Sequence, residues 1–299
     1  MKKFFIAAFL FLPAFVFANA RDLVKYVPAD SFTVIGADFI PLRSNAVFTN
    51  LEQSGKVWSD PKESDLTGYF KILNVDPQKD VKTFLFSKYL NSYGTKGDIR
   101  IFEFTRDVPL PKEGSMKYLN SELYRIDPDL DVYAAQVSPK MIAIGDLNEA
   151  KMAVDLAQGK IASLAQNGAL SALLSKVPQP SAVWGLAIPL SQKQASAQKG
   201  EKRESPVLGA FHDYYFYGIP EKNNIRTHFY GDAVNEKEAL FVNTFAIGIL
   251  TYSKMRVDEK AADDLDRINI EKNGTTIHAS GLVTQSLVDA YLKGDLGVE

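Results

Sequence analysis

Alternation of apolar and polar residues predicts a series of short β-strands along the chain. Residues 82–89 and 98–105 alternate on either side of a Gly-rich loop, which predicts a hairpin, and residues 211–219 and 224–233 predict a second one. Asn273-Gly274 predicts a two-residue turn between strands at 267–272 and 275–281. Further strands are expected at residues 32–39, 123–126, 132–137, 140–145 and 182–188.

Apolar positions spaced three and four residues apart predict helices between these strands. Asp146 with Glu149 has the capping-box pattern and predicts the start of a helix that stops near Gly159. Asn235 is expected to cap a long helix from residue 236 towards residue 255. Other helices are expected at 44–55, 66–73, 161–175, 259–266 and 284–292. The stripe of the long helix that is expected to face a core consists of Leu240, Phe241, Thr244, Ile247, Gly248 and Thr251.

One stretch near the start of the chain recurs in its middle. Residues 27–42 open with Val-Pro and end on Ile-Pro-Leu, and residues 177–190 do the same when a gap of two residues is allowed. Each half also ends in the order strand, strand, helix. We therefore predict an α+β protein of two tandem similar domains, residues 21–176 and 177–299, each an antiparallel sheet with helices packed on one face. Residues 27–159 and 177–293 should then superpose.

The first twenty residues have the pattern of a secretory signal peptide. Lys2 and Lys3 precede an apolar run at residues 4–17, and Ala18-Asn19-Ala20 is an A-x-A cleavage pattern. The run is shorter than the roughly 20 residues of a membrane-spanning helix, and no later segment is expected to span a membrane. We predict cleavage after Ala20 and a periplasmic or secreted protein; an uncleaved anchor is the alternative.

The charge balance bears on the classes of partner that the protein can bind, and the absence of cysteine bears on how it is stabilised. The chain has 34 basic and 36 acidic residues, and loss of Lys2 and Lys3 leaves 32 against 36, a net charge of −4. This balance gives no basic stripe of the kind that nucleic-acid binding requires. The chain has no cysteine, so an exported form must be stabilised by its cores, which a hydrophobic content of 46% allows.

Residue patterns typical of metal, nucleophile and phosphate sites are incomplete. Asp127, Asp129 and Asp131 have the spacing that opens a calcium loop, but Val132 and Ser138 occupy the positions that need Gly and Glu. A solvated turn is therefore expected there. The chain contains no G-x-S-x-G pattern and no P-loop. The sequence thus predicts no catalytic residue, no cofactor and no metal ligand.

The three histidines all lie on expected strands of the second half. Alternation places His228 on the same strand face as Arg226 and Tyr230. No pair of histidines has a tight ligand spacing such as H-x-x-x-H. Chance exposure is therefore favoured for His212, His228 and His278, and convergence on a metal is the alternative.

Aromatic residues concentrate in one strand of the second half. Alternation sends Tyr215 and Tyr217 to one face of the strand, and Tyr214 to the other. Whichever tyrosine set lies outside the core is a candidate binding surface, to which Arg226 and His228 of the paired strand add polar contacts. Ordinary core packing of both sets is the alternative.

Several short motifs resemble those of a known group of proteins. They are Val27-Pro28-Ala29-Asp30 after the signal peptide, Asp76-Pro77 and Asp80-Val81 before a strand, the strand–helix segment 145–157, and Val183-Trp184-Gly185 at a strand end. In these features the chain is similar to exported bacterial proteins of unknown function with a duplicated α+β architecture. The resemblance implies an architecture and a location, and no functional residues.

These observations together predict a non-catalytic exported protein that binds a protein partner or an apolar or peptide ligand. A structural component of the cell envelope is one alternative. An enzyme whose carboxylate-based site is not visible in the sequence is another. Residues 192–205 carry six charges and only two apolar residues, both Ala, so a solvated excursion is expected there.

Overall fold

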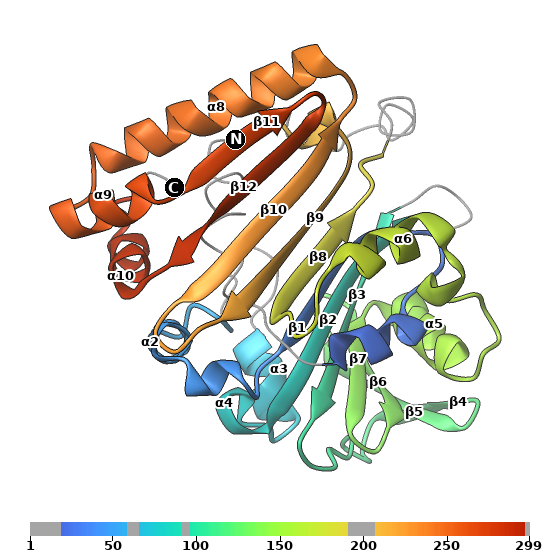
Figure 1. The fold of residues 1–299 in the computed structure, drawn as a ribbon. Helices are drawn as coiled ribbons and strands as arrows, with labels where there is room; N and C mark the ends of the chain where they lie inside the picture. Colours follow the sequence, from blue (N-terminus) through green and yellow to red (C-terminus); the bar gives the residue numbers. More distant parts are fainter. Residues whose placement is uncertain (1–18, 59–65, 91–95, 191–206, 297–299) are drawn as a thin grey trace.

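Strand β1 (Ser31–Asp38) lies inside the sheet, where it pairs with β2 (Val81–Leu90) on one side and β8 (Val183–Ala187) on the other. The computed structural model describes residues 19–58, 66–90, 96–190 and 207–296. Within these ranges the strands form one twelve-stranded sheet in the order β11-β12-β10-β9-β8-β1-β2-β3-β7-β6-β5-β4 (Figure 1). The other strands are β3 (Lys96–Phe104), β4 (Ser115–Tyr118), β5 (Ser121–Asp127), β6 (Val132–Ser138), β7 (Met141–Gly145), β9 (Phe211–Pro220), β10 (Ile225–Ala233), β11 (Asn269–Asn273) and β12 (Thr276–Val283).

The sheet has the same strand order on both sides of the β1–β8 pair. Outward from this pair the first half runs β1-β2-β3-β7-β6 and the second half runs β8-β9-β10-β12-β11. The neighbouring strands are antiparallel, as in β1–β2, β8–β9 and β10–β12. The predicted α+β class is confirmed, and the two expected units share one continuous sheet. Their duplication and the boundary at residue 176 stay predictions.

Helices connect the strands and begin at the expected caps. The capping box of Asp146 and Glu149 starts α5, and the Asn235 side chain accepts the Glu238 backbone N–H at the start of α8. The α-helices are α2 (Ala46–Gln53), α3 (Leu66–Ile72), α4 (Pro77–Asp80), α5 (Leu147–Ala157), α6 (Gly168–Lys176), α8 (Glu236–Lys254), α9 (Glu259–Asp266) and α10 (Gln285–Lys293). The 3-10 helices are η2 (Asn19–Tyr26), η3 (Leu42–Ser44), η4 (Leu164–Gln166) and η5 (Leu208–Ala210).

Helices cover both faces of the sheet in the first half, so the prediction of helices on one face is wrong there. Phe48 of α2 and Phe70 of α3 pack with Phe102 on one side. Residues of η2, α5 and α6 pack with Leu85 and Ile101 on the other side. The reason is that strands β2 and β3 carry apolar residues on both faces, and each face is buried.

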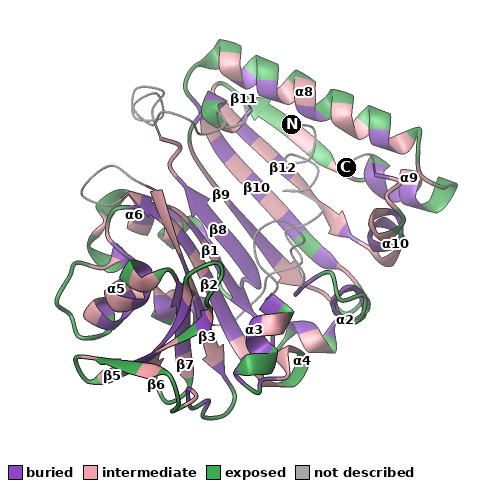
Figure 2. Cartoon of the chain, turned by 180° about the vertical axis from the view of Figure 1, so that it is seen from behind, coloured by how far each residue is buried: buried purple, intermediate pink, exposed green. Residues whose placement is uncertain are grey.

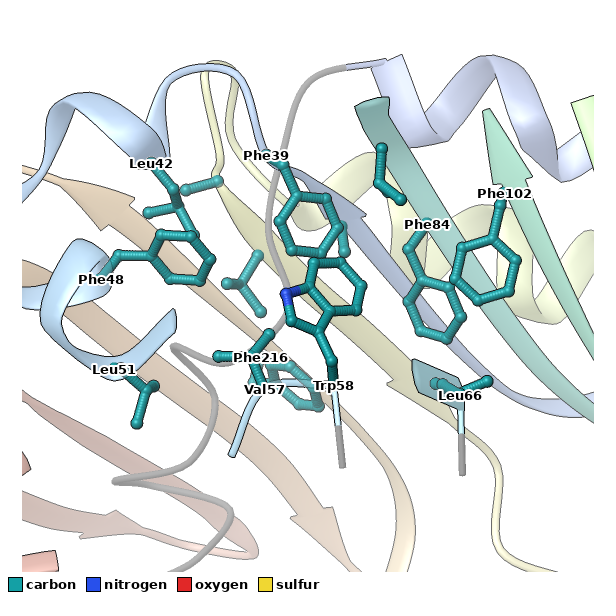
Figure 3. Close-up of a cluster of buried hydrophobic side chains, with 14 of the residues drawn as sticks. Phe39, Leu42, Phe48, Leu51, Val57, Trp58, Leu66, Phe84, Phe102 and Phe216 are labelled. Atoms are coloured by element: carbon teal, nitrogen blue, oxygen red, sulfur yellow. The ribbon is translucent and has the colours of Figure 1, made fainter. Parts of the chain in front are cut away.

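The first of these cores is rich in aromatic rings (Figure 3). The ring centroids of Phe39 and Trp58 are 4.8 Å apart, and those of Phe84 and Phe102 are 4.9 Å apart. Phe216 of β9 lies among the same side chains, so this core continues from the first half into the second. The two halves are therefore joined by shared side-chain packing as well as by backbone pairing.

Two glycines allow the rings at the junction of the halves to lie against neighbouring backbone. A Cβ on Gly36 of β1 would lie 2.3 Å from the indole ring of Trp184, and one on Gly185 of β8 would lie 2.2 Å from the Phe216 ring. Trp184 is fully buried on the side of Val34 and Leu85, whereas Phe216 is on the opposite side. On each side of the β1–β8 pair, therefore, a buried ring occupies the space that a side chain on the neighbouring glycine would need.

The orientation predicted for α8 is wrong. Its buried residues are Ala239, Val242, Ala246 and Ser253, which pack beside β10, β11 and β12. The predicted core stripe, which includes Leu240, Phe241 and Ile247, is exposed to solvent. The helix has apolar residues on both sides, and the smaller ones fit against the sheet. Figure 2 shows exposed residues recurring along the outer side of α8.

Two expectations fall on residues that the structure does not describe. The predicted signal peptide covers residues 1–20, of which 1–18 lie outside the described ranges, and the predicted charged excursion at 192–205 lies entirely outside them. Among the residues that are described, no helix is both long and apolar enough to cross a membrane.

Candidate functional site

One face of the second half of the sheet is lined by aromatic and histidine side chains, of which one, Tyr217, is buried and the rest are partly exposed. We call it the open face, and define it by Tyr215 and Tyr217 of β9, His228 and Tyr230 of β10, and His278 of β12. On the opposite side of the same strands Phe216, Phe229 and Ile277 are buried. In Figure 1 the described helices leave β10 and β12 uncovered on the viewer's side, while α5, α6 and η2 lie over the first half.

Strand register brings these side chains into neighbouring rows. Tyr217 lies opposite His228, and Tyr215 opposite Tyr230, which in turn lies opposite His278. The ring centroids are 4.9 Å apart for Tyr215–Tyr230 and 4.2 Å apart for Tyr230–His278, with interplanar angles of 11° and 10°. Tyr217 and His228 stack at 4.8 Å. Because side chains stand roughly perpendicular to a sheet, parallel rings present their edges to solvent.

The two histidines of the open face are in direct contact. Nδ1 of His228 lies 3.3 Å from Nε2 of His278, and the rings are parallel with centroids 5.6 Å apart. Burial lowers the pKa of His228, and the neighbouring His278 and Arg226 lower it further. On its other side, Nδ1 of His278 lies 3.9 Å from a carboxylate oxygen of Glu271. A charge on His228 would therefore face the His278 ring at contact distance, which is one of the reasons why its pKa is lowered.

Burial keeps the phenol groups of Tyr215 and Tyr217 protonated at neutral pH. Burial raises the pKa of Tyr215 to about 12, and the neighbouring Tyr230, Asp232 and Asp213 contribute in the same direction. Burial also raises the pKa of Tyr217 well above its usual range. Neutral phenol groups are hydrogen-bond donors and acceptors at the edge of an apolar ring. The face therefore combines apolar area with donors and suits amphipathic ligands.

The structure places four of the five predicted surface residues on one side of the sheet. Tyr215, Tyr217 and His228 belong to the open face, and Arg226 lies at its end, paired with Glu221 at 2.7 Å. Tyr214 is on the other side, where its ring is 5.8 Å from Phe211 and 5.7 Å from Phe229. The alternation of β9 is thus as expected.

Two members of the open face were not among the predicted surface residues. Tyr230 and His278 come from β10 and β12, and the period of two on those strands was the available signal. Tyr230 and His278 come together only because β10 pairs with β12, and these strands are more than forty residues apart in the chain. The sequence alone does not predict this pairing. His212 lies apart, exposed, with Nδ1 3.1 Å from Asp213.

The described residues hold no group of three or more His, Cys, Asp or Glu side chains arranged to bind a metal ion. The Asp127 side chain accepts the backbone N–H groups of Asp129 and Leu130, both at 3.0 Å. These bonds form the turn that the incomplete calcium pattern predicted.

A buried carboxylate at the end of β1 is the nearest feature to an acid–base site. Asp38 is fully buried, its Oδ1 accepts the Ile40 backbone N–H at 2.9 Å, and its Oδ2 has no hydrogen-bond partner. Burial raises its pKa to about 7, against the lowering effects of that hydrogen bond and of Lys82. Lys82 itself pairs with Glu103 at 2.7 Å. The Asp38 carboxylate closes the turn after β1, so a structural role accounts for its position.

Comparison with known proteins identifies a similar fold. No protein-family model and no curated protein sequence matches the chain. Two solved structures of TP0453 are similar to it. Crystal form III has a TM-score of 0.50 at 8% identity and covers 90% of this chain and 97% of that one. Crystal form I has a TM-score of 0.49 at 8% identity, with coverages of 91% and 97%. At this identity the likeness shows the fold alone.

Proposed function

We propose that this protein is an exported, non-catalytic binding protein, and that its open face takes an extended peptide segment of a protein partner. The observation that carries the proposal is the stack of parallel rings formed by Tyr215, Tyr230 and His278. Aromatic rings are frequent anchors in binding surfaces because they offer large apolar area with few rotatable bonds.

The chemistry of the open face indicates which class of ligand it can bind. Ring edges provide apolar contact, and the phenol groups and the histidine pair provide hydrogen-bond donors and acceptors. An extended peptide presents apolar side chains and backbone carbonyl groups at comparable intervals. Three neighbouring strands span roughly 10 Å, which is wide enough for one such segment.

The export signal and the duplicated architecture belong to the same proposal. The pattern at residues 1–20 supports a periplasmic or secreted location. The identical strand orders on the two sides of the β1–β8 pair support an origin from one repeated α+β unit. In this interpretation the second copy has kept an uncovered face, and binding uses that face.

The proposal is tested by affinity capture from an envelope extract with two kinds of variant. We expect a captured partner to be lost from the Tyr215→Ala/Tyr230→Ala protein, because both rings are part of the stack. Tyr118→Ala is the matched control, since Tyr118 is a partly exposed tyrosine on the same side of the sheet in the first half. Near-UV circular dichroism must show that each variant is folded.

A second pair of variants separates binding from folding. Tyr215→Phe and Tyr230→Phe keep the rings and remove the hydroxyl groups, so they should weaken capture without changing the melting temperature by more than a few degrees. Retention of the partner by both the Ala and the Phe variants would place binding elsewhere on the molecule. The structural envelope role would then be the better interpretation.

A further inference from the structure

We infer that two copies of this chain associate through the outer side of α8, in an antiparallel arrangement with two-fold symmetry. The outer stripe of α8 is defined by Leu240, Phe241, Thr244, Ile247, Gly248, Thr251, Tyr252 and Met255, all of them exposed. It lies on a different element from the open face, so the inference is independent of the proposed function.

The stripe is unusually apolar for a surface that faces solvent. The exposed fraction is 58% for Leu240, 47% for Ile247 and 74% for Met255. No charged residue occurs between Glu238 and Lys254. A helix that is apolar on all sides is normally buried on all sides, and the sheet covers only one side of α8. The outer side therefore requires a partner surface of its own.

The charges at the two ends of α8 indicate which partner fits. Glu236 and Glu238 lie in the first turn with Lys237 between them, whereas Lys254 ends the helix and Arg256 lies in the turn after the Met255 cap. Glu236 and Lys254 are 18 residues apart, which is about five full turns of the helix. Arg256 follows Glu238 by the same number of residues and continues the direction of the helix, because the Met255 cap keeps helical dihedral angles (φ −73°, ψ −10°). Each acid therefore shares one edge of the stripe with a base at the opposite end of the helix.

This arrangement is self-complementary when α8 meets a second α8 running in the opposite direction. With the two-fold axis near residue 246, Glu236 of one copy approaches Lys254 of the other along one edge, and Glu238 approaches Arg256 along the other edge. Within its own chain Lys254 pairs with Asp266, and Arg256 donates a hydrogen bond to the Tyr252 hydroxyl at 3.3 Å, so each base adds the partner's acid to a contact that it already makes. A two-fold interface of this kind uses the same patch on both partners.

The size and position of the stripe suit such an interface. From residue 240 to residue 255 it extends about 22 Å along the helix, and Gly248 and Thr244 near its middle allow two helices to approach closely. Two stripes of this length bury on the order of 1,000 Å², the lower range of specific interfaces. Figures 1 and 2 both show α8 at the margin of the molecule, beside β11.

The association is tested by light scattering after gel filtration of the purified protein over a range of concentrations. We expect a dimer, and expect Ile247→Glu to raise its dissociation constant about tenfold or more, equivalent to about 1.4 kcal/mol. Ile161→Glu is the matched control, because Ile161 is an exposed isoleucine of the first half. Its dissociation constant should equal that of the parent protein.

Charge reversal tests the antiparallel register. Glu238→Arg and Arg256→Glu should each weaken the dimer, and the protein that carries both changes should regain it. Since the chain has no cysteine, a mixture of the Thr244→Cys and Gly248→Cys proteins should also form a disulfide-linked dimer faster than either protein alone.

Three results would overturn the inference. One is a monomer at every concentration reached. Another is a dimer that Ile247→Glu leaves intact. The third is a monomer that sediments with phosphatidylcholine vesicles and loses this binding in Ile247→Glu, which would assign the stripe to a lipid surface.

Discussion

The two halves of the sheet have corresponding strands and differ in the chemistry of one face. On that face β2 and β3 of the first half carry Leu85, Ile99 and Ile101, all fully buried beneath η2, α5 and α6. On the corresponding strands of the second half, β9 and β10, the same side carries Tyr215, His228 and Tyr230, which remain partly exposed, and Tyr217, which is buried. Aliphatic side chains require a cover, whereas rings with polar atoms at their edges can remain wet. Coverage of a sheet face is therefore determined by the residue types on it.

The largest expected difference between the halves is in the free energy of unfolding lost when a side chain of β3 or of β10 is truncated to Ala. Ile101→Ala should lower the free energy of unfolding by about 2–5 kcal/mol, because it leaves a cavity in a closed core. Tyr230→Ala should lower it by about 1 kcal/mol, since a partly exposed ring loses mainly its stacking contacts. Urea denaturation of both variants measures the difference. Equal losses would mean that the open face is as closely packed as the covered one.

The next largest expected loss of stability comes from a substitution at the junction of the two halves, between β1 and β8. Gly36→Ala places a methyl group 2.3 Å from the fully buried indole of Trp184. We expect a loss of about 1–3 kcal/mol, typical of an overpacked core. Gly168→Ala is the control, because a Cβ there meets no atom within 4 Å. Thermal unfolding of the two variants compares them, and an unchanged melting temperature for Gly36→Ala would show that the ring can shift.

Most elements of this fold follow from the sequence, because their signals are local. The Asn273-Gly274 turn joins β11 to β12 with Gly274 at φ +58°, and the period of two in β9 separates Tyr214 from Tyr215. The orientation of α8 did not follow, since both of its sides carry apolar residues and the larger ones, Leu240 and Phe241, are on the exposed side. Choosing between two apolar sides depends on which one fits the sheet. The pairing of β1 with β8 and of β10 with β12 is also non-local, so the meeting of His228 with His278 had no sequence signal beyond face alternation.

A buried carboxyl group in the first half, that of Asp38, makes the stability of this half depend on pH. The pKa of Asp38 is raised to about 7 by burial, above its ordinary value near 3.8. Its stabilising contribution is therefore complete below the ordinary value and is lost as pH rises through about 7. Glu149, whose pKa burial also raises to about 7, acts in the same direction. In the second half Ala187 ends β8 near the corresponding place, and it has no charge to bury.

Asp38→Asn separates this contribution from that of Glu149. The variant keeps an oxygen for the Ile40 N–H, so its stability at pH 5 should match that of the parent within about 1 kcal/mol. Between pH 5 and pH 8 the variant should gain about 2–3 kcal/mol of stability relative to the parent, since the raised pKa of Asp38 lies about two units above pH 5. Chemical denaturation across pH 5–8 measures the slope. A parent and variant with the same slope would assign the pH dependence to other groups.

The smallest expected effect concerns the histidine pair of the open face and is read most directly by NMR. The pKa of His228 lies below its ordinary value because of burial, and because a charge on it would face His278 and Arg226. A base whose pKa is lowered by folding contributes stability above its ordinary pKa and loses it as pH falls through the lowered value. His278→Gln removes one of the three causes and keeps a hydrogen-bonding side chain. Titration of the imidazole proton resonances, of which the chain has only three sets, should therefore show a higher pKa for His228 in the variant. His212→Gln is the control, because His212 lies at the other end of β9 and pairs with Asp213.

An unchanged His228 titration in His278→Gln would mean that the His278 ring has no influence on the pKa of His228, and that the two rings of the open face titrate independently.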